Sequence, residues 1–183
     1  MKSIKQAHSI HDLRELARRR LPGSIFHYLD GGAEDEFSAR NNTSAFDEVK
    51  LLPRCLVDVS SVSTATRVLG QDVQWPLICS PTGASRFYHP DGELAVARAA
   101  AKAGVIYSLS VAATHSLEAV AKAADGLTMF QVLAFKDRDI TRELIRRCKQ
   151  AGYPALCLTV DAAARGSCVR AWAFRRGCPS IPS

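Results

Sequence analysis

The repeating unit of this chain appears first in residues 76–110, which read PLICSPTGASRFYHPDGELAVARAAAKAGVIYSLS. An apolar run is followed by a polar turn, an Ala-rich stretch of helical character, a glycine and a second apolar run. The unit recurs twice more, which predicts strands at Leu77–Ser80, Val105–Leu109, Leu127–Val132 and Ala155–Val160 and helices at about 91–103, 116–124 and 137–151. Because the strands are continuously apolar, we predict a parallel sheet buried on both faces and built from right-handed βαβ units.

Polar residues follow every predicted strand, namely Ser80-Pro81-Thr82-Gly83, Ser110, Gln131, and Thr159 with Asp161. Periodicity alone fits a doubly wound sheet and a (β/α)8 barrel equally well. In a barrel the carboxyl ends of the strands form the ligand-binding face, where polar residues are expected. The sequence contains no GxGxxG or GxxxxGK[ST] motif, which argues against a Rossmann or P-loop nucleotide site.

The residues before this repeat are of a different kind. Helical spacing predicts a helix over residues 9–20, a short one from Ser24 that stops at Gly31, and a third over 34–46. Two β-prone pieces follow, at Val57–Val59 and Thr66–Leu69. We therefore divide the chain into a helical and irregular lead-in (1–75), the first half of a (β/α)8 barrel (76–163) and an atypical basic tail (164–183).

Composition limits the classes of function. The 183 residues are 47% hydrophobic and 23% charged, which is typical of a globular domain. Four arginines in the last nineteen residues supply most of the net charge of +6, and residues 1–164 carry only +2, so we expect no nucleic-acid partner. Six cysteines without a CxxC pair predict neither a disulfide framework nor a metal site. Lacking a secretory signal in its first residues, the chain is expected to be cytoplasmic, with attachment to the inner membrane face left open.

The motifs together resemble the FMN-dependent 2-hydroxy acid dehydrogenases and oxidases, a family that includes L-lactate dehydrogenases, glycolate oxidases and mandelate dehydrogenases. The resemblance spans roughly residues 9–161 and is carried by the segments 26–35 (FHYLDGGAED), 52–54 (LPR), 58–60 (DVS), 80–83 (SPTG), 89–93 (HPDGE), 130–131 (FQ), 136–138 (KDR) and 158–161 (LTVD). It implies a (β/α)8 TIM barrel with FMN in its mouth, of which this chain would form the lead-in and about four βα units.

The resemblance also implies roles for single residues. The cofactor-binding residues would be Pro81, Thr82 and Gly83 beside the flavin ring, and Ser110, Gln131 and Thr159 on its polar edge. Tyr28 would bind the substrate carboxylate, and Asp161 would orient a catalytic histidine that this chain does not contain. The residues alone also allow plainer roles: Ser110 and Thr159 could satisfy backbone groups, Gln131 could be structural, and Tyr28 could be a packed helix aromatic.

Three departures bear on activity. Leu133 occupies a position where the family places a substrate-contacting tyrosine, and Cys168 one where it places an arginine. The tail composition suggests a change of reading frame near residue 164. The chain has about half the family's length, and the resemblance assigns the catalytic histidine, the carboxylate-binding arginine and the phosphate site to the other half.

From these points we expect FMN-dependent oxidation of a small, lactate-like L-2-hydroxy acid to the 2-keto acid, incomplete in the isolated chain. The alternatives are an inactive fragment and a half-barrel that needs a separate C-terminal half. We expect a homo-oligomer at full length.

Overall fold

The computed structural model describes residues 4–124 and 127–161. The predicted basic tail and Cys168 lie outside these residues. Two compact units divide the described chain, one within residues 4–56 and the other within residues 57–161. Each unit is described by itself.

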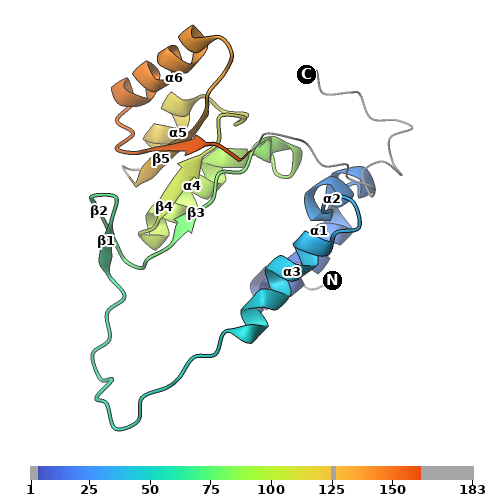
Figure 1. The fold of residues 1–183 in the computed structure, drawn as a ribbon, viewed down its shortest axis with the longest axis vertical. Helices are drawn as coiled ribbons and strands as arrows, with labels where there is room; N and C mark the ends of the chain where they lie inside the picture. The colour runs from blue at the N-terminus through green and yellow to red at the C-terminus, as the bar shows by residue number, and fades with distance from the viewer. Residues whose placement is uncertain (1–3, 125–126, 162–183) are drawn as a thin grey trace. The chain divides into compact units, whose positions relative to one another are not determined.

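The first unit is helical, as predicted (Figure 1). Its elements are η1 (Ile4–Gln6), α1 (Ile10–Arg20), α2 (Gly23–Asp30), α3 (Phe37–Ser44) and η2 (Ala45–Glu48). Helix α1 begins where the Ser9 side chain accepts a hydrogen bond from the Asp12 N–H at 3.2 Å. Arg14 on α1 donates two hydrogen bonds to Asp30 at the end of α2, at 2.5 and 2.8 Å, and this pair joins the two helices.

The second unit begins with exposed chain and a small hairpin. Strands β1 (Thr66–Val68) and β2 (Gln71–Val73) pair antiparallel. Leu69 and Gly70, which join them, both have positive φ angles, 51° and 78°, as a two-residue type I′ turn requires. The predicted strand at Thr66–Leu69 is confirmed. The other β-prone piece, Val57–Val59, forms no strand, because residues 57–59 are exposed and pair with no strand in the described chain.

A four-stranded parallel sheet forms the centre of this unit, and its strand order equals the chain order. The strands are β3 (Ile78–Cys79), β4 (Ile106–Leu109), β5 (Thr128–Leu133) and β6 (Leu156–Thr159). The connections hold η3 (Ser85–Phe87), α4 (Gly92–Ala103), α5 (Leu117–Ala124) and α6 (Arg138–Gln150). All four predicted strands and all three predicted helices of the repeat are therefore confirmed, with ends that shift by at most one residue.

Helices α4, α5 and α6 cover one face of the sheet (Figure 1). We call this the helix face. Large side chains from the strands form the core on this face. They include Tyr107, Leu109, Phe130 and Val132, and each of them is buried. A smaller apolar cluster of Val73, Ile106 and Met129 lies on the opposite face, which we call the inner face.

Successive residues of a strand alternate between these two faces. On β4, Tyr107 and Leu109 belong to the helix-face core, whereas Ile106 belongs to the inner cluster and Ser108 and Ser110 follow at the same spacing. The inner face is thus apolar at the start of its strands, and except for Leu133 at the end of β5 it is polar at their carboxyl ends.

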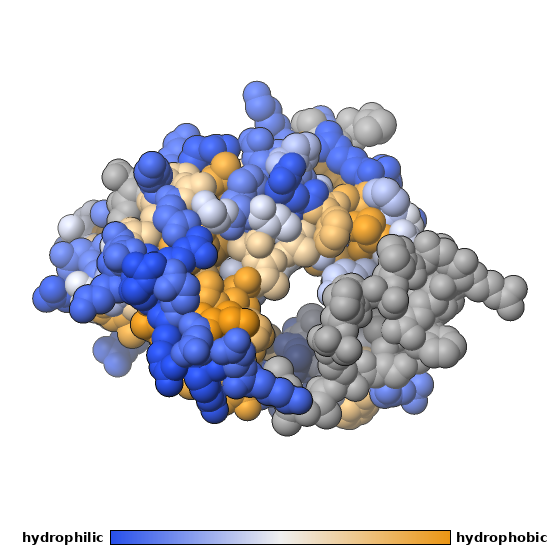
Figure 2. Space-filling view, turned by 90° about the horizontal axis from the view of Figure 1, so that it is seen from above, coloured by the Kyte–Doolittle hydropathy of each residue, from blue (hydrophilic) through white to orange (hydrophobic). Residues whose placement is uncertain are grey.

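Apolar side chains also reach the surface, as orange areas between hydrophilic ones in Figure 2. On the outer strand β6 and just after it, Leu156, Leu158 and Val160 are exposed. Among the described helices, none is long and apolar enough to cross a membrane.

Candidate functional site

A chain of hydrogen bonds links the carboxyl ends of three neighbouring strands. Ser110 after β4 donates from its hydroxyl to Oε1 of Gln131 on β5 at 3.2 Å, and Gln131 donates from Nε2 to Oγ1 of Thr159 on β6 at 2.6 Å. Ser110 and Gln131 are buried, and Thr159 is half-buried. Parallel pairing of β4, β5 and β6 places these strand ends at one edge of the sheet. Three of the predicted polar residues, Ser110, Gln131 and Thr159, therefore meet.

The backbone determines which way the Gln131 amide points. The Val111 N–H donates to Oε1 of Gln131 at 2.9 Å, and a backbone donor requires an oxygen at that position. The amide nitrogen must then point to Thr159. It carries two hydrogens, of which one is used, and the Thr159 hydroxyl hydrogen finds no acceptor within the described chain. Within residues 4–124 and 127–161, the amide nitrogen of Gln131 and the hydroxyl of Thr159 therefore each keep one hydrogen without an acceptor, at the carboxyl end of the sheet.

The loop after β3 runs close beside the loop after β4. A Cβ atom added to Gly83 would lie 3.0 Å from Cβ of Ala112 and 3.7 Å from Oγ of Ser110. The Ala84 N–H donates to the Ala112 carbonyl at 3.0 Å, so the two loops are also hydrogen-bonded. A larger residue at position 83 would push these loops apart, and glycine is what lets them approach. The predicted residues Pro81, Thr82 and Gly83 thus lie on a loop adjoining Ser110.

The carboxylate of Glu93 is fully buried and is hydrogen-bonded to both of these loops. Glu93 in the first turn of α4 accepts from the backbone N–H groups of Ser85 at 3.2 Å and Thr114 at 2.9 Å. It also accepts from the Thr114 hydroxyl and pairs with Nδ1 of His115, both at 2.7 Å. Burial alone would raise the pKa of Glu93, but the hydrogen bonds from His115 and Thr114 outweigh it and lower the pKa to about 2. Glu93 is therefore ionised at neutral pH.

Sequence reasoning missed the role of Glu93 and its partners. In the sequence, Glu93 stands out only as the end of the segment 89–93. A signal was present, because Glu93 shares a helical spacing with Ala97 and Ala100, and all three are buried in α4. An acidic residue on the buried face of an Ala-rich helix needs hydrogen-bond donors around it.

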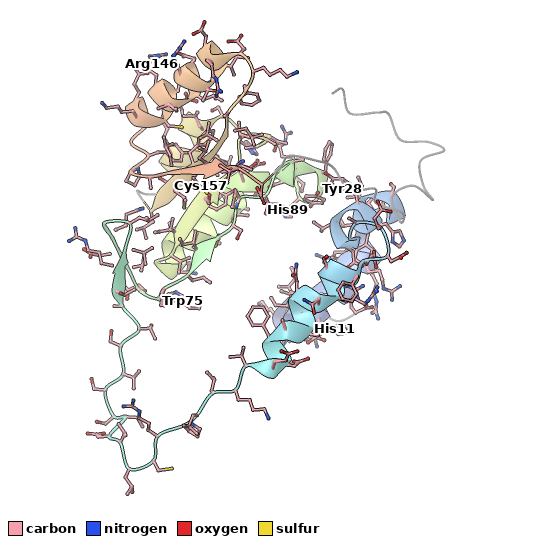
Figure 3. All side chains as sticks on the ribbon, viewed as in Figure 1. His11, Tyr28, Trp75, His89, Arg146 and Cys157 are labelled. Atoms are coloured by element: carbon pink, nitrogen blue, oxygen red, sulfur yellow. The ribbon has the colours of Figure 1, made fainter. Side chains whose placement is uncertain are left out.

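Two predicted site residues are not joined to this network by the described hydrogen bonds. Tyr28 lies on α2 in the first unit, and 58% of its surface is exposed (Figure 3). Asp161 lies two residues after Thr159 and is exposed. The roles of both residues stay predictions.

Two further residues, Leu133 and Ser108, lie on the inner face near the site. Leu133 lies opposite Thr159 in the register of β5 and β6, so an apolar side chain adjoins the polar network. Ser108 is buried, and its hydroxyl has no hydrogen-bond partner within the described chain.

Comparison with known proteins places this geometry in a family. The sequence model for FMN-dependent dehydrogenases matches residues 17–181. Among curated proteins, glycolate oxidase 3 of Oryza sativa is 42% identical over 153 residues, which are 84% of this chain and 42% of that protein. Glycolate oxidase of Spinacia oleracea is 38% identical over the same shares. The chain thus spans less than half the length of the curated relatives it matches.

Solved structures agree with the sequence matches. A crystal structure of mandelate oxidase superposes with a TM-score of 0.89 at 36% identity, covering 94% of this chain and 50% of that chain. Mandelate oxidase with (S)-4-hydroxymandelic acid superposes with a TM-score of 0.88 at 36% identity, covering 96% of this chain and 48% of that chain. The four parallel strands are therefore part of a TIM barrel, and the chain belongs to the FMN-dependent dehydrogenase family.

Proposed function

We propose that this chain supplies the flavin-ring half of an enzyme that oxidises a 2-hydroxy acid to the 2-keto acid with FMN. The observation that carries the proposal is the network of Ser110, Gln131 and Thr159 at the mouth of the sheet. It lies where enzymes of the barrel fold bind their ligands. The matched relatives, named glycolate oxidase and mandelate oxidase, support a 2-hydroxy acid as the class of substrate.

The residues present suit the polar edge of a flavin ring. Ring carbonyl oxygens need hydrogen-bond donors, and Gln131 and Thr159 each have one hydrogen that no acceptor of the described residues takes up. Glycine at position 83 lets this loop approach Ala112 and Ser110, so its backbone lies beside the polar network, where a flat ring would bind. When bound, FMN would accept the electrons removed from the substrate, while the protein supplies binding and orientation.

Two residues are assigned by the resemblance to the substrate side. Tyr28 would donate its phenol hydrogen to the substrate carboxylate, and Asp161 would orient an imidazole and stabilise its protonated form. Leu133 cannot donate a hydrogen bond, so any substrate binding at that position relies on apolar contact. A lactate-like substrate remains a prediction, and comparing glycolate, L-lactate and L-mandelate in a dye-reduction assay of this chain complemented by a separate C-terminal half would test it.

FMN titration tests the ring-binding role directly. We expect the full chain to quench FMN fluorescence on binding and Gln131→Leu to weaken binding by roughly tenfold or more, since three groups lose their shared partner. Ser108→Ala is the matched control, because it removes a hydroxyl from the same face of the sheet without breaking a described hydrogen bond. Failure of the wild-type chain to bind FMN, or equal binding by Gln131→Leu, would contradict the proposal.

A further inference from the structure

We propose that Glu93 is a positioning residue for the cofactor site, joining the loop after β3 to the loop after β4; this inference rests on the proposed function. No atom of Glu93 lies at the surface, so it acts through the residues it holds. The two loops are the ones that present Gly83 and Ser110.

The geometry shows how one side chain reaches both loops. Oε1 of Glu93 accepts from the Ser85 N–H, two residues after Gly83, and from the Thr114 N–H, four residues after Ser110. Two backbone groups from different loops thus share one oxygen. Displacement of either loop would leave a buried N–H or part of a carboxylate without a partner, which is costly.

The second oxygen strengthens the connection to the later loop. Oε2 accepts from the Thr114 hydroxyl and from Nδ1 of His115, both at 2.7 Å. An ionised carboxylate can only accept, so Nδ1 of His115 carries a hydrogen. His115 also packs against the start of α4, where a Cβ added to Gly92 would lie 3.3 Å from Cε1 of His115. These contacts fix the loop after β4 to the same helix that carries Glu93.

The shape and charge of Glu93 have separable effects. In Glu93→Gln, the amide oxygen can still accept from Ser85 and Thr114, and the amide nitrogen can donate to the Thr114 hydroxyl and to the other tautomer of His115. Glu93→Leu keeps a similar volume but offers no acceptor at all. The glutamine variant should therefore retain most of the connection, and the leucine variant should lose it.

Hydrogen exchange and FMN titration of the full chain test the inference together. In Glu93→Leu we expect faster exchange in residues 82–88 and 111–116, unchanged exchange in α6, and FMN affinity lower by roughly tenfold. Glu93→Gln should restore most of both. Glu143→Gln, the same change in an exposed pair with Arg146 on α6, is the matched control and should alter neither.

The possible outcomes separate the two proposals. Unchanged exchange in both loops overturns the connection, and faster exchange with unchanged FMN affinity overturns the positioning role. If Glu93→Leu does not fold, Thr114→Val decides in its place, with faster exchange in residues 111–116 and weaker FMN binding expected. A wild-type chain that binds no FMN refutes the proposed function and the positioning role with it, while exchange still reports whether Glu93 joins the loops.

Discussion

The two faces of the parallel sheet are built for different purposes. The helix face is closed by α4, α5 and α6 over buried apolar side chains such as Leu109 and Phe130. The inner face carries a connected polar network, Ser110, Gln131 and Thr159, at its carboxyl edge. Because neighbouring residues of one strand point to opposite faces, stability and recognition are separated by a single step along the chain. A substitution at Leu109 should therefore destabilise the fold, whereas one at Ser110 should alter binding.

The largest expected effect is on the helix face. Leu109→Ala removes a side chain that is 0% exposed and leaves a cavity, which should lower the free energy of unfolding by about 2–5 kcal/mol. Urea denaturation measures it. Leu158→Ala is the matched control, because Leu158 pairs in register with Val132 but is 55% exposed. Equal losses in the two variants would contradict the contrast between a closed core and an open strand.

Acid should weaken the connection that Glu93 makes between α4 and the loops after β3 and β4. The pKa of Glu93 lies at about 2, below its ordinary 4.5, so the folded state binds this proton less readily than the unfolded state. The resulting stability is complete above pH 4.5 and is lost as the pH falls toward 2, on the order of 3 kcal/mol.

Denaturation midpoints across this pH range would measure that loss, and Glu93→Gln should flatten it. Glu118→Gln is the control. The Arg147 guanidinium also lowers the pKa of Glu118 to about 2, but this pair is partly exposed to solvent and should contribute at most about 1 kcal/mol. A slope that is unchanged in Glu93→Gln would show that other groups cause it.

A smaller effect is expected within the polar network. Thr159→Val removes the acceptor of the Gln131 amide and one free donor, and should cost about 1 kcal/mol of stability while weakening FMN binding several-fold. Denaturation and FMN titration of the same sample separate the two effects. A loss of stability as large as that of Leu109→Ala would mean that the inner face also serves as core.

The smallest effect is expected at Ser108. Its hydroxyl is buried and has no partner in the described residues, so Ser108→Ala should leave stability within about 0.5 kcal/mol of wild type or raise it slightly. Thermal denaturation is sensitive enough to show this. A loss above 1 kcal/mol would indicate that the hydroxyl bonds to a group not yet identified, such as an internal water.

The fold was predictable because each βα unit carries its own local signals. Gly104, which closes α4 with φ of 67°, marks a helix end that can be read directly from the chain. The meeting of Ser110, Gln131 and Thr159 was also predictable, since carboxyl ends of parallel strands share one edge. Residues 57–59 are β-prone but form no strand, because such residues form a strand only beside a partner strand.

The loop-to-loop role of Glu93 was harder to foresee. It depends on backbone N–H groups of Ser85 and Thr114, which every residue carries and no motif reveals. The spacing of Glu93 with Ala97 and Ala100 predicts that Glu93 is buried, but it does not predict which groups Glu93 binds. Tyr28 and Asp161 remain predictions for a similar reason, because their roles depend on partners that strand and helix patterns do not specify.

The strand order of the sheet has a consequence for folding during synthesis. Within the described sheet, β4, β5 and β6 each pair with the strand that precedes them in the chain, so their pairing needs no distant segment. As the ribosome releases the polypeptide, β4 can dock on β3, and β5 on β4, in the order in which they emerge. Such short-range pairing reduces the loop-closure entropy of each step, so the sheet can grow one unit at a time.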